Sequence, residues 1–165
     1  MGGWGSGTWT RSNTKATVES CPAVLSVYDL ARDGVLQTGA RGTLWWTSPL
    51  TDCTLMMLEY AVHQDEFGHT FRVRYRYGSE KIAFEIRLQT TKCNYGGKRW
   101  WFTCPLKGCD RRVAKLYLSG PYFGCRHCHD LTYRTCQRSK RSKEFEKEFM
   151  ARHLGTDSTD PQRIF

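Results

Sequence analysis

Residues 71–88 read FRVRYRYGSEKIAFEIRL, and this stretch decides the fold of the first part of the chain. Apolar and polar side chains alternate on both sides of Gly78 and Ser79, and this period of two predicts two β-strands. A two-residue turn with glycine first favours a type II′ turn, which pairs Phe71 with Ile86. The apolar pairs then share one face and the arginines the other. A slip of one residue would destroy this agreement, so the stretch predicts an antiparallel hairpin with one buried face.

The residues before the hairpin predict a small β-meander that begins with a helix. Alternating patterns over 43–46 and 54–62 indicate two further strands. Ser26 as an N-cap, with Asp29 three residues later and Gly34 as a C-cap, predicts a short helix over about 26–33. That helix would offer three side chains to the core: Val27, Leu30 and Ala31. The expected fold class is α+β.

Eight cysteines are present, and four of them form two closely spaced pairs. Cys104 and Cys109 make a C-x4-C pair, and Cys125 and Cys128 make a C-x2-C pair 15 residues later. Two short loops of this kind can bring four thiolates to one tetrahedral zinc ion. Strands are predicted over 99–103, which enters the first pair, and over 112–118, which lies between the pairs. The pattern therefore predicts a zinc ribbon with Zn²⁺ as its cofactor.

Other ligand sets stay open at this point. His127, His129 and Cys136 lie near enough in the sequence to replace one of the four cysteines. Three isolated cysteines are interpreted as small buried residues, although a second zinc site built from them is an alternative: Cys21, Cys53 and Cys93.

The chain also resembles a group of uncharacterised prokaryotic zinc-ribbon proteins associated with phages and mobile elements. The similarity is densest from 96 to 138, and the matching stretches are GGWGSG (2–7), TVESC (17–21), GGKRWWFTCP (96–105), RRVAKLYL (111–118), YFGCRHC (122–128) and LTY (131–133). The resemblance implies a zinc ribbon and implies no activity. The first cysteine pair departs from the tighter C-P-x-C spacing that is common in ribbons.

Positive charge is concentrated in the C-terminal part of the chain. The formal net charge is +9, and residues 98–165 hold 15 Lys and Arg against 7 Asp and Glu. Such a block predicts binding to a polyanion, with nucleic acid first. Trp100 and Trp101 are neighbours on a predicted strand, so at most one of them can present a stacking surface. The residues expected to contact phosphates, in DNA or RNA and with low sequence specificity, are Lys107, Arg111, Arg112, Lys115, Arg126, Arg134, Arg138, Lys140 and Arg141.

Two other functions remain as alternatives. In the first, a protein–protein adaptor, the ribbon would be purely structural and an arginine-rich sheet could recognise the partner. The arginines of that sheet are Arg72, Arg74 and Arg76, and without such a partner they are interpreted as a solvated face. A metal-dependent nuclease would use His127, His129 and Asp130, but a catalytic zinc keeps one position open and four cysteines fill it. No catalytic residue is assigned, and the protein is expected not to be an enzyme.

The composition changes along the chain predict four parts. These are a Gly/Trp-rich arm (1–16), a helix with an antiparallel sheet (17–97), the zinc ribbon (98–137), and a basic helix with a loose tail (138–165). The N-terminal residues lack the basic and apolar regions of a signal peptide, and no apolar run is long enough to span a bilayer. A cytoplasmic protein with reduced thiols is therefore expected, without a membrane partner.

Overall fold

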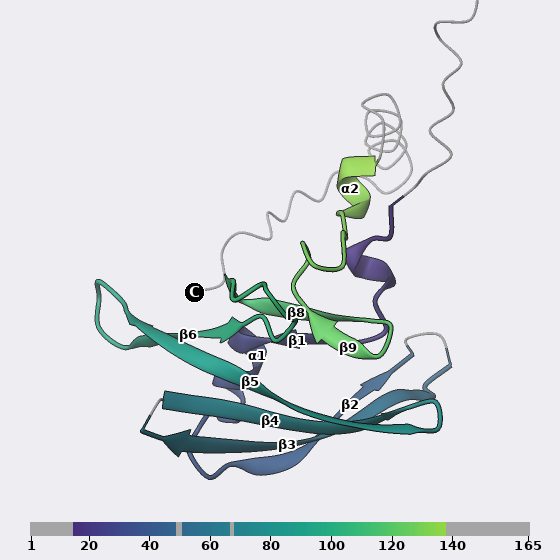
Figure 1. The fold of residues 1–165 in the computed structure, drawn as a ribbon. Coiled ribbons are helices and arrows are strands. Elements are labelled where there is room, and N and C mark those ends of the chain that lie inside the picture. The colour runs from purple at the N-terminus through teal and green to yellow at the C-terminus, as the bar shows by residue number, and fades with distance from the viewer. Residues whose placement is uncertain (1–14, 49–50, 67, 138–165) are drawn as a thin grey trace, which may run out of the picture. The chain divides into compact units, whose positions relative to one another are not determined.

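The predicted hairpin lies at the centre of a six-stranded antiparallel sheet (Figure 1). The computed structural model describes residues 15–48, 51–66 and 68–137. In it β4 (Gly68–Tyr77) pairs with β5 (Glu80–Lys92), and Phe71 lies opposite Ile86, which confirms the predicted register. Gly78 has the positive φ, 61°, that the first position of a type II′ turn requires.

The remaining strands of this sheet flank the hairpin on both sides. Their order is β2-β3-β4-β5-β6-β7, and the sheet curls into a half-barrel. The predicted strands before the hairpin are present as β2 (Arg41–Thr47) and β3 (Thr54–Asp65). On the other side lie β6 (Lys98–Thr103) and the short β7 (Arg112–Val113). The boundary predicted at residue 97 thus falls in the turn between β5 and β6, whose strands pair with each other.

A second, three-stranded antiparallel sheet has the order β1-β8-β9. It consists of β1 (Val24–Ser26), β8 (Lys115–Ser119) and β9 (Tyr122–Gly124). The single strand predicted over 112–118 is wrong, because the chain changes sheets at Ala114. The carbonyl of Ala114 accepts a hydrogen bond from the N–H of Val27 at 3.0 Å, and β8 then pairs with β1.

The described helices are short. The predicted N-terminal helix is α1 (Val27–Arg32), and it buries Val27 and Leu30 as expected. Ala31 is exposed, so its expected place in the core is wrong, and Ser26 occupies the N-cap position without a side-chain capping bond. The others are η1 (Val18–Ser20) and α2 (Arg134–Gln137). The described residues are therefore mostly β rather than α+β. No helix among them has the length and hydropathy needed to cross a membrane.

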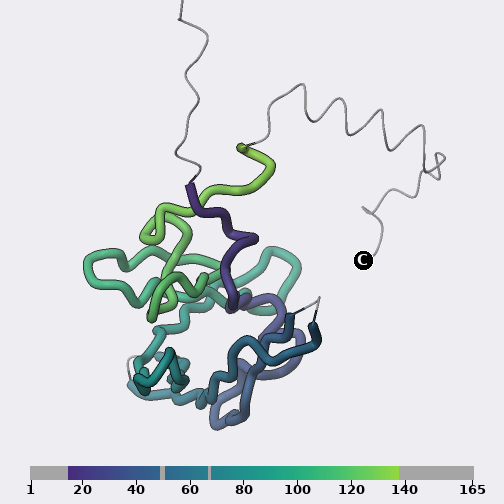
Figure 2. The backbone as a smooth tube through the Cα atoms, turned by 90° about the vertical axis from the view of Figure 1, so that its right-hand side faces the viewer, coloured from purple at the N-terminus to yellow at the C-terminus, as the bar shows by residue number. Residues whose placement is uncertain are grey.

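The hydrophobic core lies between the two sheets and includes α1. Figure 2 shows the green segment with β8 and β9 above the blue strands β2 and β3. Phe71 and Phe102 of the large sheet are fully buried, as is Phe123 of the small one. The rings of Tyr75 and Phe123 meet edge to face at 5.7 Å, and the Tyr75 hydroxyl donates to the carbonyl of Pro121. This contact holds the small sheet, and the loops that follow its strands, against the large one.

Residues 15–132 form one compact unit. Residues 133–137 lie outside this unit, and among them the N–H of Cys136 donates to the carbonyl of Tyr133. The predicted arm over 1–16 lies outside the described residues except for Lys15 and Ala16. The predicted basic helix and tail over 138–165 also lie outside them.

Candidate metal centre

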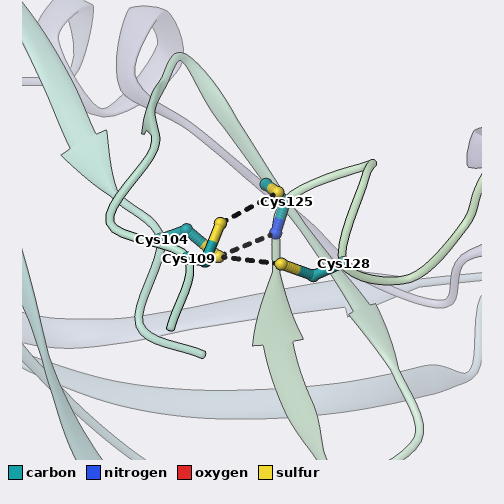
Figure 3. A group of neighbouring side chains, drawn as sticks. All are labelled: Cys104, Cys109, Cys125 and Cys128. Atoms are coloured by element: carbon teal, nitrogen blue, oxygen red, sulfur yellow. Dashed lines mark hydrogen bonds between the residues drawn. The ribbon is translucent and has the colours of Figure 1, made fainter. Parts of the chain in front are cut away.

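The four paired cysteines follow the ends of two strands that belong to different sheets. Cys104 comes directly after β6, and Cys109 lies in the turn before β7. Cys125 comes directly after β9, and Cys128 lies in the turn that follows. Because the two sheets pack face to face, their strand ends bring both loops to the same place (Figure 3).

The four sulfur atoms all lie within 4.8 Å of one another. The distance between the Cys104 and Cys128 sulfurs is 3.9 Å, and that between Cys109 and Cys125 is 3.7 Å. Zinc–sulfur bonds of about 2.3 Å place the corners of a tetrahedron about 3.8 Å apart. A disulfide needs about 2.05 Å, and all eight cysteines are free. The cluster can therefore hold one metal ion such as zinc.

Backbone N–H groups point at the sulfurs of the first loop. The N–H of Cys125 donates to the Cys104 sulfur at 3.3 Å. Burial raises the pKa of the Cys104 thiol, and the N–H groups of Leu106 and Cys125 oppose this effect. The pKa of Cys109 is lowered, first by the N–H of Arg111. Such donors stabilise thiolates, which are the form of cysteine that binds metals.

The second loop shows why four sulfurs at this spacing favour a cation. Desolvation and then the three neighbouring cysteines raise the pKa of Cys128. Negative charge on four crowded sulfurs is unfavourable unless a positive ion lies among them. A divalent metal ion among the sulfurs stabilises their negative charge, and the coordinating thiols therefore lose their protons.

The two loops pack closely because Gly124 has no side chain. A Cβ atom at Gly124 would lie 2.7 Å from Nε2 of His129 and would also overlap the end of Leu106. Leu106 comes from the first loop and His129 from the second. A side chain at the end of β9 would thus displace the ends of Leu106 and His129 from where they pack.

The described histidines and the remaining cysteines are not members of the cluster. Among the described residues, the four paired cysteines are the one group of this kind. His127 is exposed and lies 3.4 Å from the guanidinium of Arg126, while Cys136 belongs to α2, outside the compact unit of residues 15–132. The ring of His129 lies over Gly124, and burial lowers its pKa although the backbones of Tyr117 and Tyr122 act in the opposite direction. None of the isolated cysteines joins a second group, and their predicted burial is wrong, because Cys53 is exposed and Cys21 and Cys93 are only half-buried.

The residues predicted to bind nucleic acid are distributed over both loops and both sheets. Lys107 lies in the first loop, and Arg111 follows Cys109. Arg112 is on β7, with its guanidinium carbon 5.4 Å from the centre of the Trp101 ring. The other described members are Lys115 on β8, Arg126 in the second loop and Arg134 on α2. Arg138, Lys140 and Arg141 lie outside the described residues.

The two neighbouring tryptophans point to opposite faces, as predicted. Trp100 packs against the core, and its ring meets His69 edge on at 5.0 Å. Trp101 lies on the other face of β6, where its Nε1 donates to Thr91. Sequence reasoning named Arg112 on this face but missed Arg87 and Arg99, which lie on the same face as Trp101. Each of these cations occupies a polar position in the alternating pattern of its strand, which predicts that it points away from the core. Only the pairing between strands shows that cations from different strands lie on one face.

No protein-family model, curated protein or solved structure matches this chain. The comparisons thus identify no family, and the resemblance to phage-associated zinc-ribbon proteins stays a prediction.

Proposed function

We propose that this chain is a zinc-stabilised nucleic-acid-binding protein that contacts the phosphate backbone with little sequence specificity. The proposed contacts come from the two sulfur-bearing loops and the strands beside them. They are made by Lys107, Arg111, Arg112, Lys115 and Arg126, and Arg134, Arg138, Lys140 and Arg141 are proposed to extend them. The ligand thiols would be kept reduced in the cytoplasm.

The observation that carries the proposal is unbalanced positive charge beside the metal centre. Lys107, Arg111 and Lys115 are exposed, and none of them forms an ion pair with a carboxylate of the described residues. Of the two acids in residues 98–132, Asp130 is paired with Lys15 at 2.7 Å. Four thiolates and one Zn²⁺ sum to −2, which leaves this segment positive because it holds seven Lys and Arg against two Asp.

The donor set favours a structural ion over a catalytic one. Four sulfurs fill the tetrahedral shell of zinc and leave no position for a substrate or an activated water. Bound zinc would then hold the two loops together and fix the cations that they carry. This supports nucleic-acid binding more than it supports a nuclease.

The proposal is tested by fluorescence anisotropy with a labelled DNA duplex at several salt concentrations, after the metal content of the protein has been measured. Five phosphate contacts predict that log K falls with log salt at a slope near −4.5. The double variant Lys107→Glu/Arg111→Glu should weaken binding and reduce the slope by about two. Its matched control is Lys92→Glu/Lys98→Glu, which changes the net charge equally at an exposed pair on the β5–β6 hairpin.

Absence of binding to both this duplex and a single strand, or binding that is insensitive to salt, would reject the proposal. Equal weakening by both double variants would also reject it, because the effect would then come from net charge alone.

A further inference from the structure

Strand pairing collects cations on one face of the six-stranded sheet, which we call the outer sheet face. Its members are the side chains of β2–β7 that point away from the core. In register, Arg41, Ala61, Arg72 and Glu85 lie in one row across the sheet, and Arg74 lies in the next. Eight cations share the face with the acids Glu59, Asp65 and Glu85; these cations are Arg41, Arg72, Arg74, Arg76, Lys81, Arg87, Arg99 and Arg112.

Most of these cations are not neutralised by the described residues. The ion pair on this face joins Arg72 to Glu85. Arg74, Arg76 and Lys81 are exposed and form no ion pair with a described carboxylate. Arg76 lies directly opposite Lys81, and like charges in that position destabilise a strand pair. The arrangement thus costs stability in the free protein, and an anionic ligand would relieve that cost.

Exposed apolar side chains lie beside the cations on the same face. Trp45 on β2 pairs with Met57 on β3, and their exposed fractions are 66% and 61%. Adjacent exposed apolar side chains are typical of a surface that binds a ligand or a partner. Trp101 offers a second aromatic ring on the far strands, beneath the guanidinium of Arg112.

A groove lined by Met57 and by three of the cations opens on the same face. The ladder between β3 and β4 ends at Leu58 and Tyr75, although β3 continues to pair with β2 as far as Thr54. The groove at this separation has a volume of about 810 Å³. Its lining combines the exposed Leu55 and Met57 with three cations and one acid, Arg74, Arg76, Lys81 and Glu59, and it includes the buried Met56, Tyr75 and Ile82.

We infer that the outer sheet face binds single-stranded nucleic acid, an inference that rests on the proposed function and names its ligand. The arginines of β4 and β5 contact the phosphates, and bases stack on Trp45 and enter the groove beside it. A single strand presents flat bases and phosphates together, which matches a face that carries aromatic rings as well as cations. A duplex keeps its bases stacked inside and offers only phosphates to such a surface.

The test is anisotropy titration of the full chain with a fluorescein-labelled oligonucleotide of 15 thymidines and, in parallel, a 15-base-pair duplex. Trp45→Ser should weaken single-strand binding at least about fivefold, the loss expected for one stacked base. Tyr95→Ser is the matched control, because Tyr95 is fully exposed in the β5–β6 turn, away from the outer sheet face. Arg74→Ser/Arg76→Ser should lower the salt slope for the single strand by about 1.4, and Lys92→Ser/Lys98→Ser should not change it in that way.

The outcomes separate this inference from the proposed function. If Lys107→Glu/Arg111→Glu weakens binding but the Trp45 and Arg74/Arg76 variants do not, the inference is overturned and the proposed function stands. If neither oligonucleotide binds, both are overturned. Labelled polyglutamate is titrated as well: if it binds more tightly than the oligonucleotide and Arg74→Ser/Arg76→Ser abolishes that binding, the face recognises an acidic protein instead. Thermal melts of each variant establish that it is folded. If Arg74→Ser/Arg76→Ser is not folded, Arg87→Ser replaces it as the test of phosphate contacts on this face.

Discussion

Replacing Cys128 by serine removes one of the four sulfurs with little change in packing. Cys128 is exposed, whereas Cys104 and Cys125 are buried in the core and would leave cavities as well. Any large loss of stability in Cys128→Ser must then come from the metal rather than from lost contacts. Cys93→Ser is the matched control, because Cys93 is half-buried and lies outside the cluster.

The size of the effect follows from the linkage between metal binding and folding. Unfolding separates the four sulfurs, so zinc binds the folded chain and not the unfolded one. At free zinc about 1,000 times the dissociation constant, such binding stabilises the folded chain by about 4 kcal/mol. Losing the ion should therefore lower the melting temperature by about 8–16 °C for a chain of this size.

The assay combines metal analysis of the purified protein with thermal melts in zinc and in chelator. Wild-type protein should carry one zinc ion, and chelator should lower its melting temperature to that of Cys128→Ser. Chelator should have little effect on the variant, and Cys93→Ser should behave like the wild type. A wild-type protein that carries no metal and melts at the same temperature in chelator would refute the reasoning.

Two further substitutions test the scaffold. Gly124→Ala should cost about 1–3 kcal/mol in the free energy of unfolding, because its Cβ would press against Leu106 and His129; chemical denaturation measures this, and a neutral result would mean that the loops do not pack as described. Arg72→Ala and Glu85→Ala, combined in a double-mutant cycle, should give a coupling energy below about 1 kcal/mol, since this ion pair is exposed. A larger coupling would show that the outer sheet face is less hydrated than its exposure indicates.

The hairpin could be predicted because its information is local. Register in residues 71–88 depends on a two-residue turn and on a period of two, and both can be read within one short window. The cysteine cluster could be predicted for a similar reason, since each pair of ligands lies in a short loop. The helix at α1 also followed from local signals, although the exposed Ala31 shows that a helix face cannot be assigned without its neighbours.

The change of sheet at Ala114 could not be predicted in the same way. Residues 112–118 alternate like one strand, but β7 pairs with β6 and β8 pairs with β1, which comes some 90 residues earlier in the chain. Burial explains why β8 leaves the large sheet. Leu116, Tyr117 and Leu118 are all buried, so both faces of this strand must pack against other parts of the chain. These packing partners come from segments distant in the sequence, and no local pattern identifies them.

The sequence by itself determined the central hairpin and the four clustered sulfurs, because both depend on residues a few positions apart. Tertiary structure alone decided that two sheets share one core and bring the sulfur-bearing loops together. It also decided that arginines from five strands lie on one face beside Trp45. Each strand contributes only one to three of these cations, and pairing between strands distant in sequence is what adds them into a single surface.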